Sequence, residues 1–343
     1  MKILLTSYFF HPSIGGIETI SRRLAEDFVA AGHEVKVVTL TESRDEVAYG
    51  YEVARRPPKG RLLGLTRWCD VFFQNNISLN LAWPLLLVPR PWVVAHHTYI
   101  ARTDMRLGLQ DRFKRWALRL AHNISISRAI AETLPVPSTI IGNPYDDQLF
   151  RARDGVERKG DLVFVGRLVS DKGLDLLLEA LVSLRAEGLR PRLTVAGDGP
   201  ELSALKEYVK ARQLEEQVVF AGYVTGEALV ELLNTHRIMV VPSRWAEPFG
   251  LVAIEGIACG CVVAGSEGGG LKDAIGPCGV TFPNNSATGL RDALRGLLTE
   301  PGRLESFRAG AAAHLARFRR AAAARSYLEV MEKALGEGGH GTG

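Results

Sequence analysis

Short apolar runs alternate with segments of helical periodicity along almost the whole chain. The first run is Lys2–Phe10, followed by an amphipathic segment at Glu18–Ala31 and a second run at Glu34–Leu40. Apolar runs of about four to eight residues predict buried strands, and their alternation with helical segments is typical of βα units around a parallel sheet. The sequence therefore predicts an α/β fold.

The alternation breaks once, in a charged and aperiodic stretch at Pro144–Gly160. A chain of 343 residues suggests two domains at roughly 100–200 residues each. We interpret 151–160 as the linker, with one Rossmann-like domain over residues 1–150 and another over 151–320. Residues 321–343 are expected to form a helix that crosses back to the first domain, then a disordered, glycine-rich tail.

Further strands are expected throughout both domains. They are predicted at residues 70–74, 92–96, 123–127 and 139–142, and then at 162–166, 192–196, 217–221, 238–242, 261–265 and 279–282. The segment Met105–Ala121 has an apolar stripe among basic residues and predicts an amphipathic helix. Two arrangements fit this helix: it packs on the sheet with a basic outer face, or it holds the protein at an anionic membrane.

Positive charge gathers in the first half of the chain. Residues 53–128 hold thirteen Lys or Arg and three Asp or Glu, a net charge of +10, so the remainder carries −6 of the total +4. Such a region can bind phosphates or anionic lipid, or it can simply be a solvated surface. No aromatic residues are interleaved there for base stacking, which argues against a nucleic-acid partner.

Four cysteines form no CxxC pair, and no histidine cluster has metal-ligand spacing, so no metal site is expected. The cysteines are predicted to be small buried residues with reduced thiols, as in the cytosol. Met1 leads directly into a strand, which argues against a signal peptide. The most apolar stretch, Ile77–Ala95, is interrupted by prolines and makes a poor membrane span. We expect a cytoplasmic protein that can lie peripherally at the inner face of the membrane.

Glycine-rich loops follow several predicted strands, at the end of a parallel sheet where ligands bind. Gly15-Gly16 precedes the first helix, whose free amides suit a phosphate, although a plain tight turn also fits. The loop Gly166–Gly173 contains Arg167 and Lys172, which could neutralise a diphosphate or remain two solvated cations. Gly268-Gly269-Gly270 again suits phosphate binding by backbone amides.

Two carboxylates, Glu247 and Glu255, lie eight residues apart. Eight helical steps turn about 80° beyond two full turns, so Glu247 is expected in a loop and Glu255 in the helix that follows. Glu255 sits in an apolar run, where an ionised side chain is costly unless it is paired. It could accept hydrogen bonds from ribose hydroxyls or be a structural ion-pair partner. His96 and His97 end another predicted strand, and one of them is expected to contact a ligand.

The ordered set of motifs resembles the retaining glycosyltransferases of family 4. The strongest part is E-x-F-G-x-x-x-x-E over Glu247–Glu255, supported by Gly15-Gly16, Gly166-Arg167, Lys172-Gly173 and Gly269-Gly270. The resemblance implies the GT-B fold, in which two Rossmann-like parallel-sheet domains face a cleft. It also implies that the N-terminal domain takes the acceptor and the C-terminal domain the nucleotide-sugar donor.

The resemblance further implies roles for single residues. Arg167 and Lys172 bind the donor diphosphate and stabilise the departing nucleotide. Glu247 contacts the hydroxyls of the transferred sugar, and Glu255 holds the ribose. The remaining expected donor contacts are the backbones of Gly15, Gly16, Gly166, Phe249, Gly250, Leu251, Gly269 and Gly270. His97, with His96 as the alternative, approaches the donor sugar.

The reaction expected from this resemblance is transfer of a hexose-type sugar, with retention, to a glycan or lipid-linked acceptor in polysaccharide biosynthesis. The nucleotide sugar is then a substrate, and no cofactor or metal is required. Two alternative hypotheses remain. The protein is another GT-B enzyme, such as a nucleotide-sugar epimerase or a phosphorylase, or it is an inactive nucleotide-sugar-binding subunit. The inactive subunit is argued against by the presence of four residues, Arg167, Lys172, Glu247 and Glu255.

Overall fold

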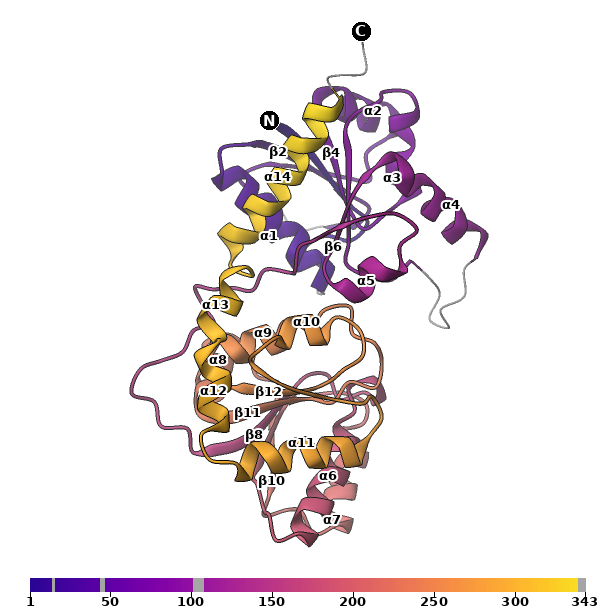
Figure 1. Cartoon of the computed structure of the whole chain (residues 1–343). Coiled ribbons are helices and arrows are strands. Elements are labelled where there is room, and N and C mark those ends of the chain that lie inside the picture. The colour runs from indigo at the N-terminus through magenta and orange to yellow at the C-terminus, as the bar shows by residue number, and fades with distance from the viewer. Residues whose placement is uncertain (14–15, 44–46, 101–107, 339–343) are drawn as a thin grey trace. The chain divides into compact units, whose positions relative to one another are not determined.

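The computed structural model describes residues 1–13, 16–43, 47–100 and 108–338 (Figure 1). The chain folds into two compact units. The N-terminal unit comprises residues 1–144 and 320–343, and the C-terminal unit comprises residues 145–319. In the described residues, no helix has both the length and the apolar character needed to cross a membrane.

The N-terminal unit is built on a parallel sheet of seven strands in the order β3-β2-β1-β4-β5-β6-β7. The strands are β1 (Lys2–Ser7), β2 (Glu34–Thr39), β3 (Glu52–Arg55), β4 (Val71–Asn75), β5 (Trp92–His96), β6 (His122–Ser125) and β7 (Thr139–Ile140). The helices are α1 (Gly16–Ala30), α2 (Lys59–Trp68), α3 (Leu79–Ala82), η1 (Trp83–Leu86), α4 (Leu109–Ala117), η2 (Leu118–Leu120), α5 (Arg128–Thr133) and α14 (Arg320–Gly338).

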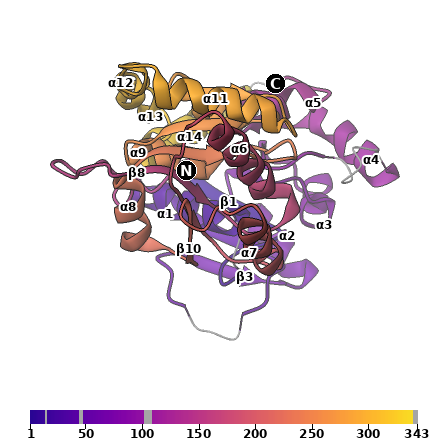
Figure 2. The same ribbon diagram turned by 90° about the horizontal axis from the view of Figure 1, so that it is seen from below.

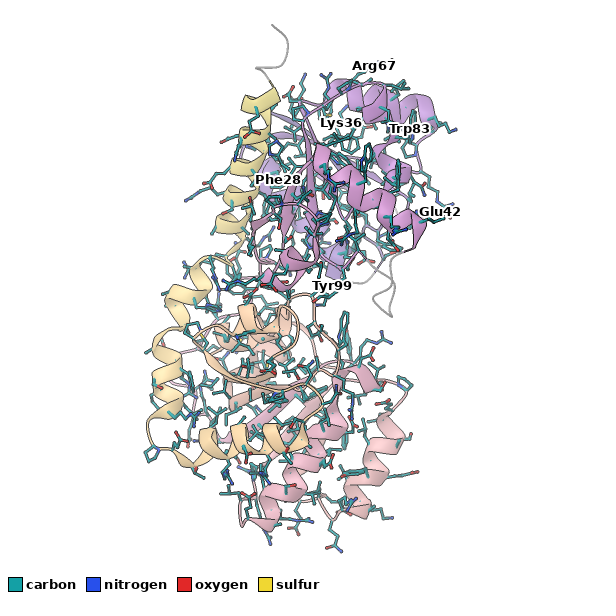
Figure 3. The ribbon with its side chains drawn as sticks, turned by 45° about the vertical axis from the view of Figure 1, so that its right-hand side comes forward. Phe28, Lys36, Glu42, Arg67, Trp83 and Tyr99 are labelled. Atoms are coloured by element: carbon teal, nitrogen blue, oxygen red, sulfur yellow. The ribbon has the colours of Figure 1, made fainter. Side chains whose placement is uncertain are left out.

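Both faces of this sheet are buried. Because successive strand residues point to opposite faces, Leu4 and Phe72 belong to one core while Leu5 and Phe73 belong to the other. Helices α1 and α14 lie side by side over the second core (Figure 1), and Phe28 of α1 points into it (Figure 3). A sheet covered on both faces explains why these strands are apolar throughout.

The end of the chain is part of the N-terminal unit. Tyr327 of α14 is fully buried, with its ring 5.7 Å from that of Phe73 and 6.4 Å from that of Phe28. At the start of the same helix, Arg320 forms ion pairs with Glu26 (3.3 Å) and Asp27 (2.6 Å). The final helix is therefore held to α1 by both apolar packing and charge.

The C-terminal unit has a second parallel sheet, of six strands in the order β10-β9-β8-β11-β12-β13. The strands are β8 (Gly160–Val165), β9 (Leu193–Ala196), β10 (Val218–Gly222), β11 (His236–Val241), β12 (Val262–Ser266) and β13 (Gly279–Phe282). The helices are η3 (Ser170–Lys172), α6 (Leu174–Ala186), α7 (Leu202–Ala211), α8 (Gly226–Asn234), α9 (Leu251–Ala258), α10 (Leu271–Ile275), α11 (Ala287–Thr299), α12 (Arg303–Ala309) and α13 (Ala311–Ala316). Helices α6 and α11 lie side by side and share one core with the sheet (Figures 1 and 2).

The predicted linker at residues 151–160 is instead part of the C-terminal unit, and the division lies between Pro144 and Tyr145 rather than after residue 150. The cause is a set of contacts that charge and aperiodicity did not reveal. The guanidinium of Arg158 donates to the carbonyls of Leu233 (3.2 Å) and His236 (2.8 Å), and the amide of Arg153 donates to Asn234 (2.7 Å). This irregular segment is therefore fixed to the end of α8 and the start of the central strand β11.

Candidate functional site

The glycine-rich loops of the C-terminal unit meet at a change in strand order. In the order β10-β9-β8-β11-β12-β13, the chain proceeds outward from β8 on one side and from β11 on the other. Ligands of open parallel sheets bind beyond the carboxyl ends of the strands at such a switch point. The loop with Arg167 and Lys172 follows β8, and the loop with Glu247 follows β11.

Two glycines allow the loops after β8, β9 and β11 to approach one another closely. Gly173 has a φ of 66°, and a Cβ there would lie 2.1 Å from the carbonyl oxygen of Pro242 in the neighbouring loop. A Cβ on Gly197 would lie 1.9 Å from the carbonyl oxygen of Gly166. Any larger residue at either position would push the loops apart, so both glycines fix the shape of the site.

Lys172 and Glu247 are in direct contact. The ammonium of Lys172 donates to Glu247 Oε1 at 2.5 Å, and the hydroxyl of Ser243 donates to the same oxygen at 2.7 Å. The Glu247 side chain is only 11% exposed, whereas that of Lys172 is 33% exposed. The pair therefore fixes the orientation of a largely buried carboxylate while its cation still reaches solvent.

The loop after β12 packs against the Glu247 segment. Gly269 forms a parallel bridge with Glu247, and the amide of Gly270 donates to the Glu247 carbonyl at 2.6 Å. Gly269 has a φ of 73°, and a Cβ there would lie 2.2 Å from that same carbonyl oxygen. The structure thus brings together Lys172, Glu247, Gly269 and Gly270, four of the residues predicted from sequence.

Sequence reasoning assigned no role to Ser243 or Asn284, although both shape this site. The side-chain amide of Asn284 donates to the carbonyls of Ser243 (3.4 Å) and Arg244 (3.3 Å), and its oxygen accepts from the amide of Gly268 (2.7 Å). It therefore ties the glycine loop to the Glu247 loop. Its sequence signal is weak, because it is simply a polar residue two positions after the strand β13.

The residues after Glu247 begin helix α9. Gly250 has a φ of 110° at the helix cap, and a Cβ there would lie 2.5 Å from Leu271 Cδ1. Phe249 is buried, with its ring 5.5 Å from that of Phe318, so this side chain is part of the core. Leu251 is the first helical residue, and Glu255 lies half-buried further along the same helix.

Arg167 is exposed in the loop after β8, next to Gly166. Another arginine, Arg244, links the two main loops. Its amide donates to the carbonyl of Asp171 at 2.8 Å, and its guanidinium pairs with Asp175 at the start of α6. This ion pair holds the Glu247 loop beside the Lys172 loop, a contact that no spacing in the sequence indicates.

In the N-terminal unit, Gly16 begins helix α1, and a Cβ there would meet no atom within 4 Å. The predicted partner Gly15 lies outside the described residues. His96 and His97 are both buried at the end of β5, and burial lowers the pKa of each imidazole to about 4. Both rings are therefore neutral near pH 7.

The two histidines differ in their surroundings. The Nε2 of His96 is 3.0 Å from the side-chain oxygen of Asn123 on the neighbouring strand β6. The backbone amide of His97 donates to Asn76 at 2.7 Å, and its buried ring lies beside the side chain of Asn143, whose interaction opposes the effect of burial on the His97 pKa. The His96 ring is thus bound to a neighbouring strand, whereas the His97 ring lies beside a residue of the segment after β7.

All four cysteines are free and buried, as predicted. Burial raises the pKa of Cys69, Cys259 and Cys261 to about 12 and that of Cys278 to about 11. Thiols in this state are poor nucleophiles. The chemistry of the switch-point site therefore lies with its ammonium, guanidinium and carboxylate groups, an arrangement suited to binding and polarising an anion.

Comparison with known proteins gives matches among the glycosyltransferases. Residues 146–314 match the family described as glycosyl transferases group 1. The glycogen synthase of Mycobacterium tuberculosis is 28% identical over 360 residues, covering 88% of this chain and 87% of that protein. The D-inositol 3-phosphate glycosyltransferase 1 of Catenulispora acidiphila is 35% identical over 210 residues, covering 58% of this chain and 50% of that protein.

Two solved structures resemble the whole chain. Sucrose-phosphate synthase from Thermosynechococcus elongatus has a TM-score of 0.78 and 22% identity, over 98% of this chain and 99% of that one. Anabaena HepE, in complex with UDP, has a TM-score of 0.81 and 18% identity, over 97% of this chain and 100% of that one. The predicted fold class, GT-B with two Rossmann-like parallel-sheet domains, is confirmed.

The family match covers almost all of the C-terminal unit, which therefore resembles a group 1 glycosyltransferase domain. Fold and relatives together support a glycosyltransferase as the class of the protein.

Proposed function

We propose that the protein is a retaining glycosyltransferase that moves a hexose-type sugar from a nucleoside diphosphate sugar to a glycan or lipid-linked acceptor. The observation that carries this proposal is the contact between Lys172 and Glu247 across the switch point of the C-terminal sheet. It joins a group suited to a phosphate with one suited to sugar hydroxyls, at the position where this class of fold binds nucleotides. That HepE has been solved with UDP is consistent with such a donor.

In the proposed complex, Lys172 bridges Glu247 and the donor diphosphate, and Arg167 supplies the second positive charge. The amides of Gly269 and of the α9 start, at Gly250 and Leu251, also face the diphosphate or sugar, while the amide of Gly270 holds the glycine loop to the Glu247 carbonyl. Glu247 accepts hydrogen bonds from the sugar, and Glu255 accepts them from the ribose. His97 and Gly16 remain the predicted donor contacts of the N-terminal unit.

In the transfer step, the bond from the anomeric carbon to the diphosphate oxygen breaks, and a bond to the acceptor oxygen forms on the same face. The acceptor proton passes to the departing phosphate. Negative charge grows on that phosphate, so the cations of Lys172 and Arg167 stabilise the transition state more than the ground state. We propose that no metal is required, because these side chains supply the positive charge.

Donor binding tests the site without knowledge of the acceptor. A thermal-shift titration with UDP-, GDP- and ADP-glucose should raise the melting temperature with at least one donor, since a ligand of the folded state stabilises it. Lys172→Ala should abolish that shift, whereas Lys210→Ala, an exposed lysine on α7, should leave it unchanged. Equal shifts in both variants would refute the assigned role of Lys172.

Transfer is tested by nucleotide release with and without a panel of glycan and lipid-linked acceptors. Release only with acceptor indicates a transferase, whereas acceptor-independent conversion of the nucleotide sugar indicates an epimerase. Lys172→Ala should lower turnover at least tenfold, since a lost transition-state contact of this kind costs on the order of 3 kcal/mol. Proton NMR of the product should show the donor's anomeric configuration, and chelator should not reduce the rate.

A further inference from the structure

Helix α4 of the N-terminal unit directs its apolar stripe into solvent. The exposed fractions are 85% for Leu109, 57% for Phe113, 53% for Trp116 and 66% for Leu120 just beyond the helix. In a helix that packs on a core, such a stripe is the buried side. Only Ala117 of α4 is buried, so of the two arrangements considered for this helix, packing of the apolar stripe on the sheet is contradicted.

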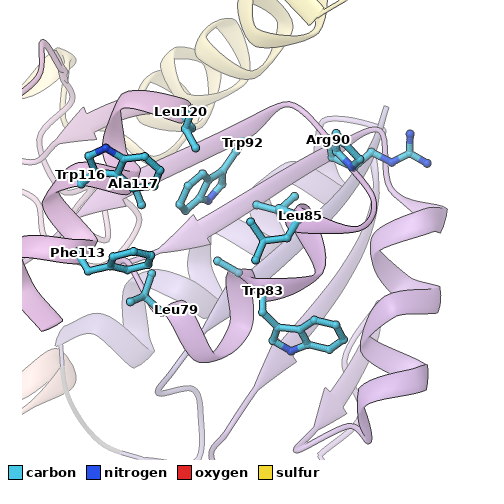
Figure 4. Close-up of a pocket in the computed structure, with 12 residues that line it drawn as sticks. Leu79, Trp83, Leu85, Arg90, Trp92, Phe113, Trp116, Ala117 and Leu120 are labelled. Carbon is cyan, nitrogen blue, oxygen red and sulfur yellow. The ribbon is translucent and has the colours of Figure 1, made fainter.

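A second exposed apolar segment lies across a cavity from α4. Leu86 and Leu87, at the end of η1, are 83% and 66% exposed. Between η1 and α4 is a cavity of about 440 Å³, lined almost entirely by apolar and aromatic side chains (Figure 4). We call Leu86, Leu87, Leu109, Phe113, Trp116 and Leu120 the apolar face.

Four aromatic side chains line this cavity. The rings of Phe113 and Trp116 stack with centroids 5.7 Å apart, and Trp92 of β5 lines the cavity near them (Figure 4). Trp83 of η1 also lines the cavity (Figure 4). Soluble proteins seldom expose several large apolar side chains around an apolar cavity unless something binds there.

Positive charge borders the apolar face. Residues 109–120 contain Arg112, Lys114, Arg115 and Arg119 against Asp111 alone, a net charge of four minus one, or +3. Arg112 and Arg119 are exposed. The single carboxylate, that of Asp111, accepts a hydrogen bond from the amide of Gly108 at 2.9 Å and so caps the helix.

We propose that the apolar face docks on an anionic lipid bilayer. Phe113, Trp116 and the exposed leucines enter the interface between headgroups and acyl chains, and one acyl chain occupies the cavity. Arg112 and Arg119 then meet the lipid phosphates. An amphipathic helix with aromatic and leucine side chains on one side and cations beside them binds anionic membranes in this way, through apolar burial and charge together.

Charge complementarity favours a bilayer over a second copy of the chain. A symmetric dimer through this face would place the same patch opposite itself, so its +3 segment would meet another +3 segment. An anionic bilayer neutralises the segment instead. The proposal goes beyond donor chemistry, because none of its residues belongs to the site at Lys172 and Glu247.

Sedimentation of the full chain with lipid vesicles tests the proposal. The protein should sediment with vesicles of phosphatidylcholine and phosphatidylglycerol, and much less with phosphatidylcholine alone. High salt should weaken the association, because surface charge is screened. Brominated acyl chains should quench tryptophan fluorescence in the wild type, and Trp116→Phe should reduce that quenching.

Variants on exposed residues separate docking from folding. Phe113→Ser with Trp116→Ser should reduce vesicle affinity at least about tenfold, and Arg112→Glu with Arg119→Glu should do the same. The matched control is Val219→Ser with Tyr223→Ser, two exposed side chains of the C-terminal unit that should leave vesicle binding unchanged. Circular dichroism should show every variant folded.

Three results would overturn the proposal. One is that the wild type does not sediment with vesicles that contain phosphatidylglycerol. Another is that the α4 variants bind vesicles as strongly as the wild type. The third is a wild-type dimer that the Phe113 and Trp116 changes dissociate, which assigns the face to a second copy. Donor-induced thermal shifts, measured without lipid, report the catalytic site separately, so failure of one inference leaves the other testable.

Discussion

The ion pair between Lys172 and Glu247 gives a prediction whose size follows from burial. Lys172→Met removes the ammonium while roughly keeping the length of the side chain. The Glu247 side chain is 11% exposed, and the Ser243 hydroxyl still donates to it in this variant. A carboxylate that loses a charged partner in such a place is left with an uncompensated charge. Lys172→Met should therefore lower the stability of the C-terminal unit.

The magnitude depends on how far water screens the pair. Lys172 is itself one-third exposed, so the full cost of breaking a buried pair, about 3–5 kcal/mol, is too large here. Loss of a hydrogen bond to a charged group costs about 1.5–3 kcal/mol. We expect a loss of about 2 kcal/mol for Lys172→Met, and recovery of at least about 1 kcal/mol when Glu247→Gln is added.

The assay is a double-mutant cycle. The wild type, Lys172→Met, Glu247→Gln and the double variant are unfolded in urea, with hydrogen exchange in β8 and β11 as a local measure of stability. A coupling energy of about 1–3 kcal/mol is expected for two residues in direct contact. A coupling within about 0.3 kcal/mol of zero would show that the pair does not form in solution, and the role proposed for Lys172 beside Glu247 would lose its basis.

Three further predictions concern glycine, a buried hydroxyl and pH. In a urea titration, Gly173→Ala should lower the free energy of unfolding by about 3 kcal/mol, because its Cβ would overlap the Pro242 carbonyl. The control Gly188→Ala should cost about 1 kcal/mol, since Gly188 has a φ of 84° but no neighbour within 4 Å. Equal losses in the two variants would contradict the overlap. Tyr327→Phe should leave stability unchanged or raise it by about 1 kcal/mol in calorimetry, since its buried hydroxyl has no partner among the described residues, and a clear loss would reveal one. Burial lowers the pKa of His96 and His97 from 6.5 to about 4, so the unfolded chain binds more protons than the folded protein between these pH values. The free energy of unfolding should therefore fall from pH 6.5 to pH 4 by up to about 3 kcal/mol per histidine. If its pH dependence is unchanged in His97→Gln, the contribution assigned to His97 is refuted.

The sequence by itself determined the class of fold, because the apolar runs match buried parallel strands. The strands predicted at 92–96 and 279–282 coincide with β5 and β13, and most others differ by one or two residues at their ends. Strand β3 and helix α2 were missed: the short, half-polar Glu52–Arg55 lies at the sheet edge, where little burial is required. The periodic signal is a record of burial, so it weakens wherever burial is partial.

Part of the site could also be predicted. Lys172, Glu247, Gly269 and Gly270 were chosen because they follow strands of one parallel sheet, and the structure brings them together. Ser243, Asn284 and the link between Arg244 and Asp175 could not be foreseen, because each depends on which loops become neighbours. Strand order decides that, and no local pattern in the chain encodes it.

Only the tertiary structure decided which face of an amphipathic segment is buried. The stripe on α4 has the periodicity of a core-facing helix, yet its side chains are exposed, while α1, which is also amphipathic, is packed against its sheet and α14. Likewise, residues 151–160 have the composition of a linker but are fixed by Arg158 to the carbonyls around β11. Periodicity and composition describe what a segment can bury or solvate, whereas the surface that it meets is set by the rest of the fold.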